Sequence, residues 1–356
     1  YERRRAEIDA FNKASPILKR GLGLFPLKFG ISFNMPHMNQ AGALVHIYTD
    51  GSIRLNHGGT EMGQGLFVKV AQVVAEVFGV DIDRIRPSAT STAEVPNTSP
   101  TAASTGSDLN GWAAWEAANT IKQRMIAFAS EHFGAAESDI EFADGAVRIA
   151  KPGSNQVVSF GELAKLCWMG RISLSATGFY KTPKIHWDGV AMHGRPFFYF
   201  SFGAAMAEVA IDTLTGESRV LRADLVQDCG DSLNPAIDRG QIEGAFVQGQ
   251  GWLTCEELWW DKQGKLRTAG PSTYKIPGSR DVPAVFNVKM LENAPSREAT
   301  IFRSKAVGEP PLLLATAVWT ALKDAIAATG DGRTAVRLDA PATPERVLAA
   351  IATLKA

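Results

Sequence analysis

Three segments of this chain combine small residues with a predicted helix start, where backbone N–H groups can approach a ligand. The first is residues 58–65, GGTEMGQG, in which four glycines stand directly before a predicted helix. Such an N-terminus stabilises an anion, and glycine permits close approach of the backbone. The Gln64 amide can both donate and accept hydrogen bonds. A glycine-rich turn without a ligand explains the same residues, and the run fits neither a Walker A loop nor GxGxxG.

The second segment, residues 99–107, is rich in serine and threonine and precedes another predicted helix. Its hydroxyl groups could bind a phosphate or a ring nitrogen of a ligand. Capping of the helix accounts for about two of these hydroxyl groups. A capped surface loop therefore stays open as the alternative.

The third segment, residues 308–311, holds one carboxylate, Glu309, between a glycine and two prolines. Proline suits the first positions of a helix and stiffens the backbone. A glutamate there usually interacts with the helix dipole. The functional alternative is a general base whose position is fixed before the substrate arrives.

Gln248 is a fourth candidate, because Gly249 and Gly251 follow it closely. These glycines could permit close approach of the backbone to a ligand. A helix C-cap explains them equally well.

Hydrophobic patterns predict the elements that must position these segments. Two hairpins are expected, at residues 43–56 and 205–226, each around a glycine-containing turn. Helices are expected at about 1–20, 66–77, 108–133, 235–247 and 312–328, with Asn234 and Pro235 at the start of the fourth. Because tight hairpins dominate over strand–helix–strand crossovers, the predicted fold class is α+β, with hairpin-rich mixed sheets and packed helices.

Composition excludes several classes of function. The 37 basic and 37 acidic residues balance, so the positive footprint of a nucleic-acid or anionic-membrane binder is missing. No apolar run approaches the roughly 18 residues of a membrane span. Cys167, Cys229 and Cys255 lie far apart, which argues against a disulfide framework, a zinc site or an iron–sulfur site built by this chain. We predict a cytoplasmic protein with neither a nucleic-acid nor a membrane partner.

Taken together and in order, the motifs resemble those of the xanthine dehydrogenase/aldehyde oxidase family of molybdenum hydroxylases. The matching segments are residues 28–33, 39–50, 58–65, 99–104, 244–249, 270–277 and 305–311. The resemblance extends from about Arg20 to Ala328. The residues within the motifs are more similar to those of xanthine dehydrogenases than to those of aldehyde oxidases. It implies the second half of the domain that binds the molybdenum-pyranopterin (molybdopterin) cofactor.

The resemblance assigns roles to the candidate residues. Glu309 matches the catalytic base, which in the family takes a proton from a molybdenum-bound hydroxyl before its oxygen attacks a ring carbon and hydride passes to a sulfido ligand. Two loops and one further side chain match cofactor contacts: Met62, Gly63 and Gln64; Ala102, Ala103 and Ser104; and Gln248. The backbone of Ala103 is expected near the metal, with no side-chain ligand.

Two residues are expected to contact the substrate. Phe33 matches one of two phenylalanines that sandwich a purine ring in the family. Asn34 stands where relatives have threonine, and this departure puts its assignment in doubt, although an amide can replace a hydroxyl as a hydrogen-bond donor.

The resemblance also implies that part of the substrate site and the other redox groups come from outside this chain. The family's purine-orienting arginine and glutamate and its second stacking phenylalanine have no match in this chain. We therefore expect the chain to be inactive alone and to need the remainder of the molybdenum domain. The 2Fe-2S and FAD groups of the complete enzyme are expected in other domains or subunits and not on this chain, and the complete enzyme is expected to oligomerise.

The expected organisation has three parts. Residues 1–24 are interpreted as a helix and linker from a preceding domain, because the chain opens Tyr1-Glu2-Arg3 like a cut end. Residues 25–340 form the cofactor-binding half-domain, with two subdomains meeting near 190–205, and residues 341–356 form a C-terminal helix.

The expected activity is oxidation of hypoxanthine and xanthine to urate. Two alternatives stay open. One is an aldehyde oxidase or another molybdenum hydroxylase that acts on a different aza-heterocycle. The other is a structural or assembly module that binds no cofactor.

Overall fold

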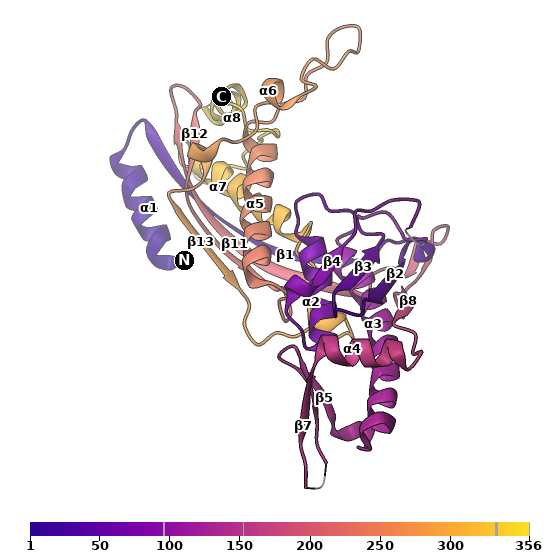
Figure 1. Cartoon of the computed structure of the whole chain (residues 1–356). Coiled ribbons are helices and arrows are strands. Elements are labelled where there is room, and N and C mark those ends of the chain that lie inside the picture. Colours follow the sequence, from indigo (N-terminus) through magenta and orange to yellow (C-terminus); the bar gives the residue numbers. More distant parts are fainter. Residues whose placement is uncertain (95–96, 152, 332–333, 356) are drawn as a thin grey trace. The chain divides into compact units, whose positions relative to one another are not determined.

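The computed structural model describes residues 1–94, 97–151, 153–331 and 334–355 as a mixture of helices and mixed sheets (Figure 1). The predicted fold class is thus confirmed. The chain divides into two compact units. Unit 1 comprises Tyr1–Phe29, Phe200–Pro295 and Val307–Ala356, and unit 2 comprises Gly30–Tyr199 and Ser296–Ala306.

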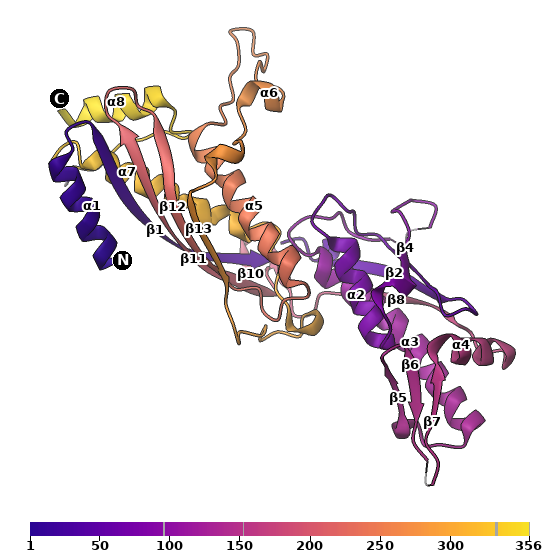
Figure 2. The same ribbon diagram turned by 60° about the vertical axis from the view of Figure 1, so that its left-hand side comes forward.

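Unit 1 is built on a four-stranded sheet in the order β1-β11-β12-β13 (Figure 2). The strands are β1 (Leu18–Ile31), β11 (Tyr199–Asp212), β12 (Ser218–Gln227) and β13 (Val285–Met290). β11 and β12 form the predicted second hairpin and pair antiparallel, whereas β12 and β13 pair parallel. Alternate residues of β11, from Ala205 to Ile211, are buried in the apolar core because strand side chains alternate between faces.

The helices of unit 1 are α1 (Glu2–Ala14), α5 (Pro235–Thr254), α6 (Pro271–Tyr274), α7 (Thr316–Ala327) and α8 (Pro344–Lys355). The predicted start of α5 is confirmed, because the Asn234 side chain accepts a hydrogen bond of 3.0 Å from Ile237 N and Pro235 begins the helix. Phe246 of α5 and Val318 of α7 are fully buried in the same core as β11.

The first helix is shorter than predicted. α1 ends at Ala14, and β1 then begins at Leu18 and includes Gly21 and Gly23, which lie in the segment interpreted as a helix and linker. Tertiary contact explains the strand: a Cβ at Gly21 would lie 1.9 Å from the Ala321 carbonyl oxygen of α7. The missing side chain lets the helix pack directly against the strand, a contact that local propensity does not report.

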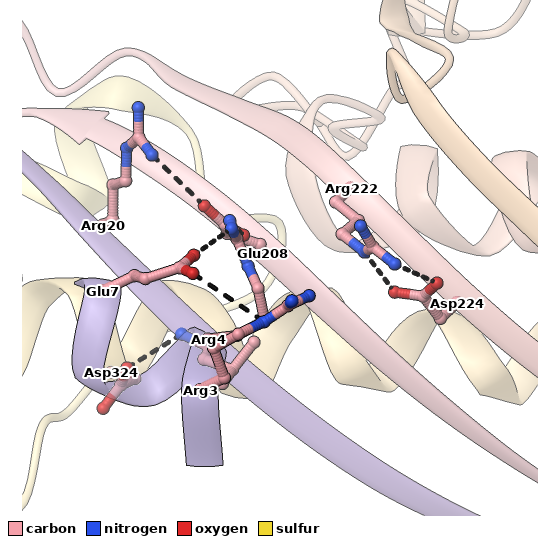
Figure 3. Close-up of polar contacts among 9 residues, drawn as sticks. Arg3, Arg4, Glu7, Arg20, Glu208, Arg222, Asp224 and Asp324 are labelled. Carbon is pink, nitrogen blue, oxygen red and sulfur yellow. Dashed lines mark hydrogen bonds and ion pairs between the residues drawn. The ribbon is translucent and has the colours of Figure 1, made fainter. Parts of the chain in front are cut away.

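A buried carboxylate holds α1 on the sheet. Glu208 of β11 points away from the apolar core and is 2% exposed. It pairs with Arg4 of α1 and, at 3.5 Å, with Arg20 of β1 (Figure 3). Arg5 of α1 also pairs with Asp324 of α7 at 2.5 Å. Charged pairs thus fix α1 to unit 1 where apolar contact is limited, since only Ile8 of α1 is buried.

Unit 2 contains a sheet in the order β4-β3-β2-β8, covered by long helices (Figure 1). Its strands are β2 (Gln40–Ile47), β3 (Ile53–His57), β4 (Ile85–Pro87) and β8 (Ser175–Lys181), and its helices are α2 (Leu66–Phe78), α3 (Gly106–Phe133) and α4 (Phe160–Met169). β2 and β3 form the predicted first hairpin. The predicted apolar stripe of α2, from Leu66 to Val77, is buried, and α3 packs on β8 and β2.

Smaller strands complete unit 2. β5 (Ile140–Ala143), β6 (Ala146–Ile149) and β7 (Gln156–Ser159) form a three-stranded sheet, and β9 (His186–Asp188) pairs with β10 (His193–Arg195). Among the residues that the structure describes, no helix is both long and apolar enough to cross a membrane.

We predict that Glu208→Gln loosens α1 because Arg4 and Arg20 lose a buried counter-charge. Removing one partner of a buried ion pair costs roughly 3–5 kcal/mol, and the partly exposed arginines place this case at the lower end. Hydrogen exchange at residues 2–14 is the measurement, and the exchange rate in Glu208→Gln should be higher than in wild type. Glu7→Gln is the control, because Glu7 also pairs with Arg4 but is 49% exposed and should contribute about 0–1 kcal/mol. Equal exchange in the two variants would contradict the anchoring role.

Candidate functional site

The glycine-rich loop between β3 and α2 is folded around the Glu61 carboxylate. Oε1 accepts hydrogen bonds from Gly63 N at 2.8 Å and Gly65 N at 3.0 Å, and Oε2 accepts one from Phe67 N at 3.0 Å. The helix N-terminus that was predicted to stabilise a bound anion therefore receives its anion from the chain itself. The sequence argument gave Glu61 no role, although an acidic residue just before a helix start is a recognisable signal.

The pKa of Glu61 confirms the strength of this arrangement. Partial desolvation raises the pKa, but the backbone N–H groups of Phe67, Gly63, Gly65 and Leu66 outweigh desolvation and lower it below its ordinary value. Glu61 is therefore ionised at neutral pH. A second anion at the start of α2 would be repelled, so this helix start does not suit a phosphate group.

The tip of the same loop presents backbone outward. Gln64 fixes the tip, since its Oε1 accepts from Met62 N at 2.6 Å and its Nε2 donates to Thr60 O at 2.8 Å. Gly63 has a φ of +104°, which L side chains rarely adopt, and a Cβ there would meet no atom within 4 Å. Met62 is 67% exposed. The loop is thus rigid on its inner side and open on its outer side, which fits close approach of a ligand.

The second predicted loop lies against the first. Thr60 N donates a 2.8 Å hydrogen bond to Thr101 Oγ1, which joins the two segments. Ala103 and Ser104 follow with φ values of +53° and +55°. Two successive non-glycine residues in the left-handed region cost on the order of 1–3 kcal/mol each, and such strain gathers at ligand sites. The small side chain of Ala103 leaves its backbone accessible to a partner.

The expected capping role of this loop is wrong for Thr105. Thr105 is the N-cap residue of α3, yet it makes no side-chain capping hydrogen bond. Its hydroxyl donates instead to Ala102 O at 3.0 Å. Thr98 and Ser99 accept from the backbone of β2 at Gly42 N and Gln40 N. These hydroxyls hold the strained loop in place and do not close the helix.

The predicted substrate residues lie on a loop that Asn39 organises. The buried Asn39 accepts a hydrogen bond from Phe33 N at 2.8 Å and donates to Phe33 O at 2.9 Å and Met35 O at 3.1 Å. Phe33 is half-buried and Asn34 is exposed. Sequence reasoning placed Asn39 in a matching segment but missed this role, because a local asparagine clamp leaves no periodic signal.

Glu309 lies in unit 1, before a 3-10 helix (Pro310–Ala315) that leads into α7. An α-helix was predicted from Leu312, but residues 310–315 form a 3-10 helix and the α-helix begins at Thr316. Leu312 N donates to the Glu309 carbonyl oxygen at 3.2 Å, while the Glu309 side chain is exposed and makes no capping hydrogen bond. The role of Glu309 as a general base stays a prediction, as does its alternative, an interaction with the helix dipole.

Gln248 is exposed on α5, in the same unit as Glu309. The predicted C-cap at Gly249 is wrong, because α5 continues to Thr254. Gly249 serves close packing instead: a Cβ there would lie 2.4 Å from Leu312 O in the 3-10 helix after Glu309. The elements that carry Gln248 and Glu309 are thus in direct contact.

A cavity of about 750 Å³ in unit 1 is lined mainly by β11, β12, the end of α5 and residues 275–281. None of the predicted site residues, all of which the structure describes, lines it. A search of the described residues also finds no group of three histidine, cysteine or acidic side chains that could hold a metal ion. The predicted site residues thus lie on the loops and on the α5 and 3-10 helix segments described above, outside this cavity.

Known proteins are similar to this chain over most of its length. A family model described as a molybdopterin cofactor-binding domain matches residues 1–283. The chain belongs to this family. It is 48% identical over 353 residues to the xanthine dehydrogenase/oxidase of Felis catus and 47% identical over 353 residues to the xanthine dehydrogenase of Dictyostelium discoideum. The expected family resemblance is confirmed. These alignments cover 98% of this chain but 25% and 24% of the relatives, so the chain spans about a quarter of their length.

Solved structures agree with the family assignment. Quinoline 2-oxidoreductase from Pseudomonas putida 86 is 27% identical with a TM-score of 0.81, over 99% of this chain and 43% of that chain. Carbon monoxide dehydrogenase from Oligotropha carboxidovorans has a TM-score of 0.84 over 100% of this chain and 44% of that chain. At 22% identity, the second likeness shows the fold alone.

We predict that Glu61→Gln weakens the loop at neutral pH, because three backbone donors lose an ionised acceptor. Loss of a helix-start acceptor typically costs about 0.5–2 kcal/mol. The pKa of Glu61 is lowered from 4.5. The loss of loop stability relative to wild type should therefore be complete above pH 4.5 and should vanish as the pH falls through the lowered pKa. Hydrogen exchange at residues 60–67, recorded against pH, measures this loss of loop stability. Glu131→Gln, at an exposed position of α3, is the control and should show no such pH dependence.

We predict that Gly63→Ala lowers cofactor content because a Cβ at the loop tip would face the ligand. The substitution also strains the backbone by roughly 1–2 kcal/mol. Gly134→Ala controls for strain, since Gly134 has a φ of +67° with no atom within 4 Å of a Cβ and lies at the far end of α3. Molybdenum per polypeptide, measured by mass spectrometry in the complete enzyme, should fall only for Gly63→Ala. Equal occupancy in both variants would contradict the cofactor contact.

Proposed function

We propose that this chain is the second half of the molybdenum domain of a xanthine dehydrogenase, which oxidises hypoxanthine and xanthine to urate. The observation that carries the proposal is the Gly308-Glu309-Pro310-Pro311 segment, which presents an exposed carboxylate on a proline-stiffened backbone in a molybdopterin-binding family member. Its relatives' names support xanthine as the substrate.

Two loops and one further side chain would hold the cofactor. Met62, Gly63 and Gln64 would contact it through the outward-facing loop tip, and Ala102, Ala103 and Ser104 through the strained loop beside that tip. Gln248 would add a side-chain amide, and the backbone of Ala103 would lie near the metal. The bound cofactor supplies the two-electron redox chemistry and the oxygen that enters the product, while the protein supplies position and electrostatics.

Glu309 would act as the general base. A carboxylate accepts a proton efficiently when its position is fixed before the substrate binds. The two prolines and the packing of the 3-10 helix against Gly249 provide that fixation.

Phe33 and Asn34 would orient the substrate. The Phe33 ring would stack on a planar heterocycle, and the Asn34 amide would donate to or accept from its edge. The Asn39 clamp supports this role because it fixes the backbone that carries both side chains. Asn34 also supports a second candidate substrate class, another aza-heterocycle, since the residue departs from the threonine of relatives.

Further polypeptide is part of the proposal. We expect the remainder of the molybdenum domain to complete the purine site, and other domains or subunits to bring the iron–sulfur and FAD groups. The chain alone is expected to oxidise no xanthine with any acceptor. The complete enzyme is proposed to be a cytoplasmic oligomer.

We predict that Glu309→Gln in the complete enzyme slows molybdenum reduction by xanthine at least about a hundredfold, because a general base contributes about 10²–10⁴ in rate. Gln has nearly the same shape, so the molybdenum content should stay and the melting temperature should shift by only a few degrees. Stopped-flow reduction by xanthine measures the rate.

Glu345→Gln is the matched control, because Glu345 is an exposed glutamate beside a proline in the first turn of α8. A glutamate that only interacts with a helix dipole takes no part in the reaction, so molybdenum in the Glu345→Gln variant should be reduced by xanthine at the wild-type rate. If Glu309→Gln behaved like Glu345→Gln, Glu309 would not be the base and the proposed function would lose its main support.

A further inference from the structure

A buried chain of hydrogen bonds crosses unit 2 outside the loops described above. The Tyr199 hydroxyl donates to Asp108 Oδ2 at 2.7 Å, and its oxygen accepts from Ala306 N at 2.9 Å. Asp108 is 8% exposed and Tyr199 is 6% exposed. A single hydroxyl therefore links a buried carboxylate to a backbone N–H group.

The three residues lie on segments that are far apart in sequence, and two of them are neighbours along the chain of residues proposed for the site. Asp108 is in the first turn of α3, four residues after Ser104. Ala306 is three residues before Glu309, and Tyr199 is the first residue of β11. The hydrogen bonds thus connect the helix that follows the strained cofactor loop with the segment that leads to the proposed base.

The electrostatics of Asp108 are unusual. Burial raises its pKa from 3.8 to about 7, although the Tyr199 hydrogen bond and the charge of Lys69 act to lower it. Lys69 faces it from α2, and Tyr180 of β8, whose own pKa the charge of Asp108 helps to raise, faces it from the sheet. Because the pKa is raised, the carboxylate lowers stability increasingly as pH rises from about 4 to about 7. Stability therefore does not explain a carboxylate at this position.

We propose that Tyr199 and Asp108 are positioning residues for Glu309, which they hold through Ala306. The inference rests on the proposed function, in which Glu309 is the base. An ionised Asp108 can only accept, so it fixes the direction of the Tyr199 O–H and leaves the hydroxyl lone pairs for the Ala306 N–H. A protonated Asp108 can donate to the same hydroxyl, and the orientation is then no longer unique.

The test uses the complete enzyme with Tyr199→Phe, which removes the hydroxyl and keeps the ring. Hydrogen exchange of residues 304–309 should rise at least about fivefold because the Ala306 N–H loses its acceptor. The kcat for xanthine should fall about tenfold through misplacement of the base, with KM within roughly twofold and molybdenum content unchanged. Tyr180→Phe is the matched control, since this tyrosine also lies near Asp108 but has no hydrogen bond to Ala306 among those described.

A second variant keeps the test decisive if Tyr199→Phe is unstable. Asp108→Asn retains an oxygen acceptor for Tyr199 but does not ionise. Wild-type kcat should rise as pH increases through about 7, the pKa of Asp108, whereas Asp108→Asn should lose this ascending limb. An unchanged pH profile in Asp108→Asn would overturn the role of its charge.

The outcomes separate this inference from the proposed function. We call the Tyr199–Ala306 hydrogen bond the Tyr199 clamp. If hydrogen exchange at residues 304–309 of Tyr199→Phe matched that of the Tyr180→Phe control, the clamp would be overturned whatever the activity. Faster exchange with normal kcat would show that the clamp does not position the base, while a slow Glu309→Gln would leave the proposed function intact. A normal rate in Glu309→Gln would instead refute the role of Glu309 as the base. The hydrogen exchange of Tyr199→Phe would still test whether Tyr199 holds the Ala306 segment.

Discussion

Helix starts leave backbone N–H groups without acceptors inside the helix, and three of the segments expected to build the site come directly before one. The chain satisfies each start in a different way. At α2 the Glu61 carboxylate accepts three hydrogen bonds. At the 3-10 helix after Glu309, two prolines remove donors. At α3 the Thr105 hydroxyl donates to Ala102 O of the same loop and makes no capping hydrogen bond. How these donors are satisfied decides which groups are left for a ligand.

The result is a site in which the chain's own carboxylates have different roles. Glu61 is ionised and fully used within its loop, so it supports the backbone at Gly63 without reaching outward. Glu309 makes no capping hydrogen bond and is exposed. Asp108 is buried and accepts a hydrogen bond from the Tyr199 hydroxyl, which in turn accepts one from Ala306 N. The same functional group thus serves as a structural acceptor, a proposed base and a proposed positioning group, according to burial and the donors around it.

Part of the site could be predicted from the sequence because its signals are local. Glycine density marked residues 58–65 as a segment whose backbone can approach a ligand closely, and the Glu-Pro-Pro run marked residues 309–311 as a stiffened one. The strand and helix periodicities placed both segments between the right elements. Glu61, Asn39, Asp108 and Tyr199 were missed as functional residues. Their roles depend on hydrogen bonds to particular N–H groups, and no periodicity in the sequence records such pairing.

The sequence by itself determined the two hairpins, the stripe of α2 and the cap of α5, since each depends on residues that are near one another in the chain. It also determined the family, through motifs that follow one another in order along the chain. Only the tertiary structure decided that residues 18–31 form one strand, that α5 passes through Gly249, and that Asp108 meets Tyr199. The reason is that Gly21 and Gly249 are needed where another element approaches, and a buried carboxylate acquires its pKa from groups brought together by folding. Contacts between distant segments carry that information, and a pattern along the chain does not.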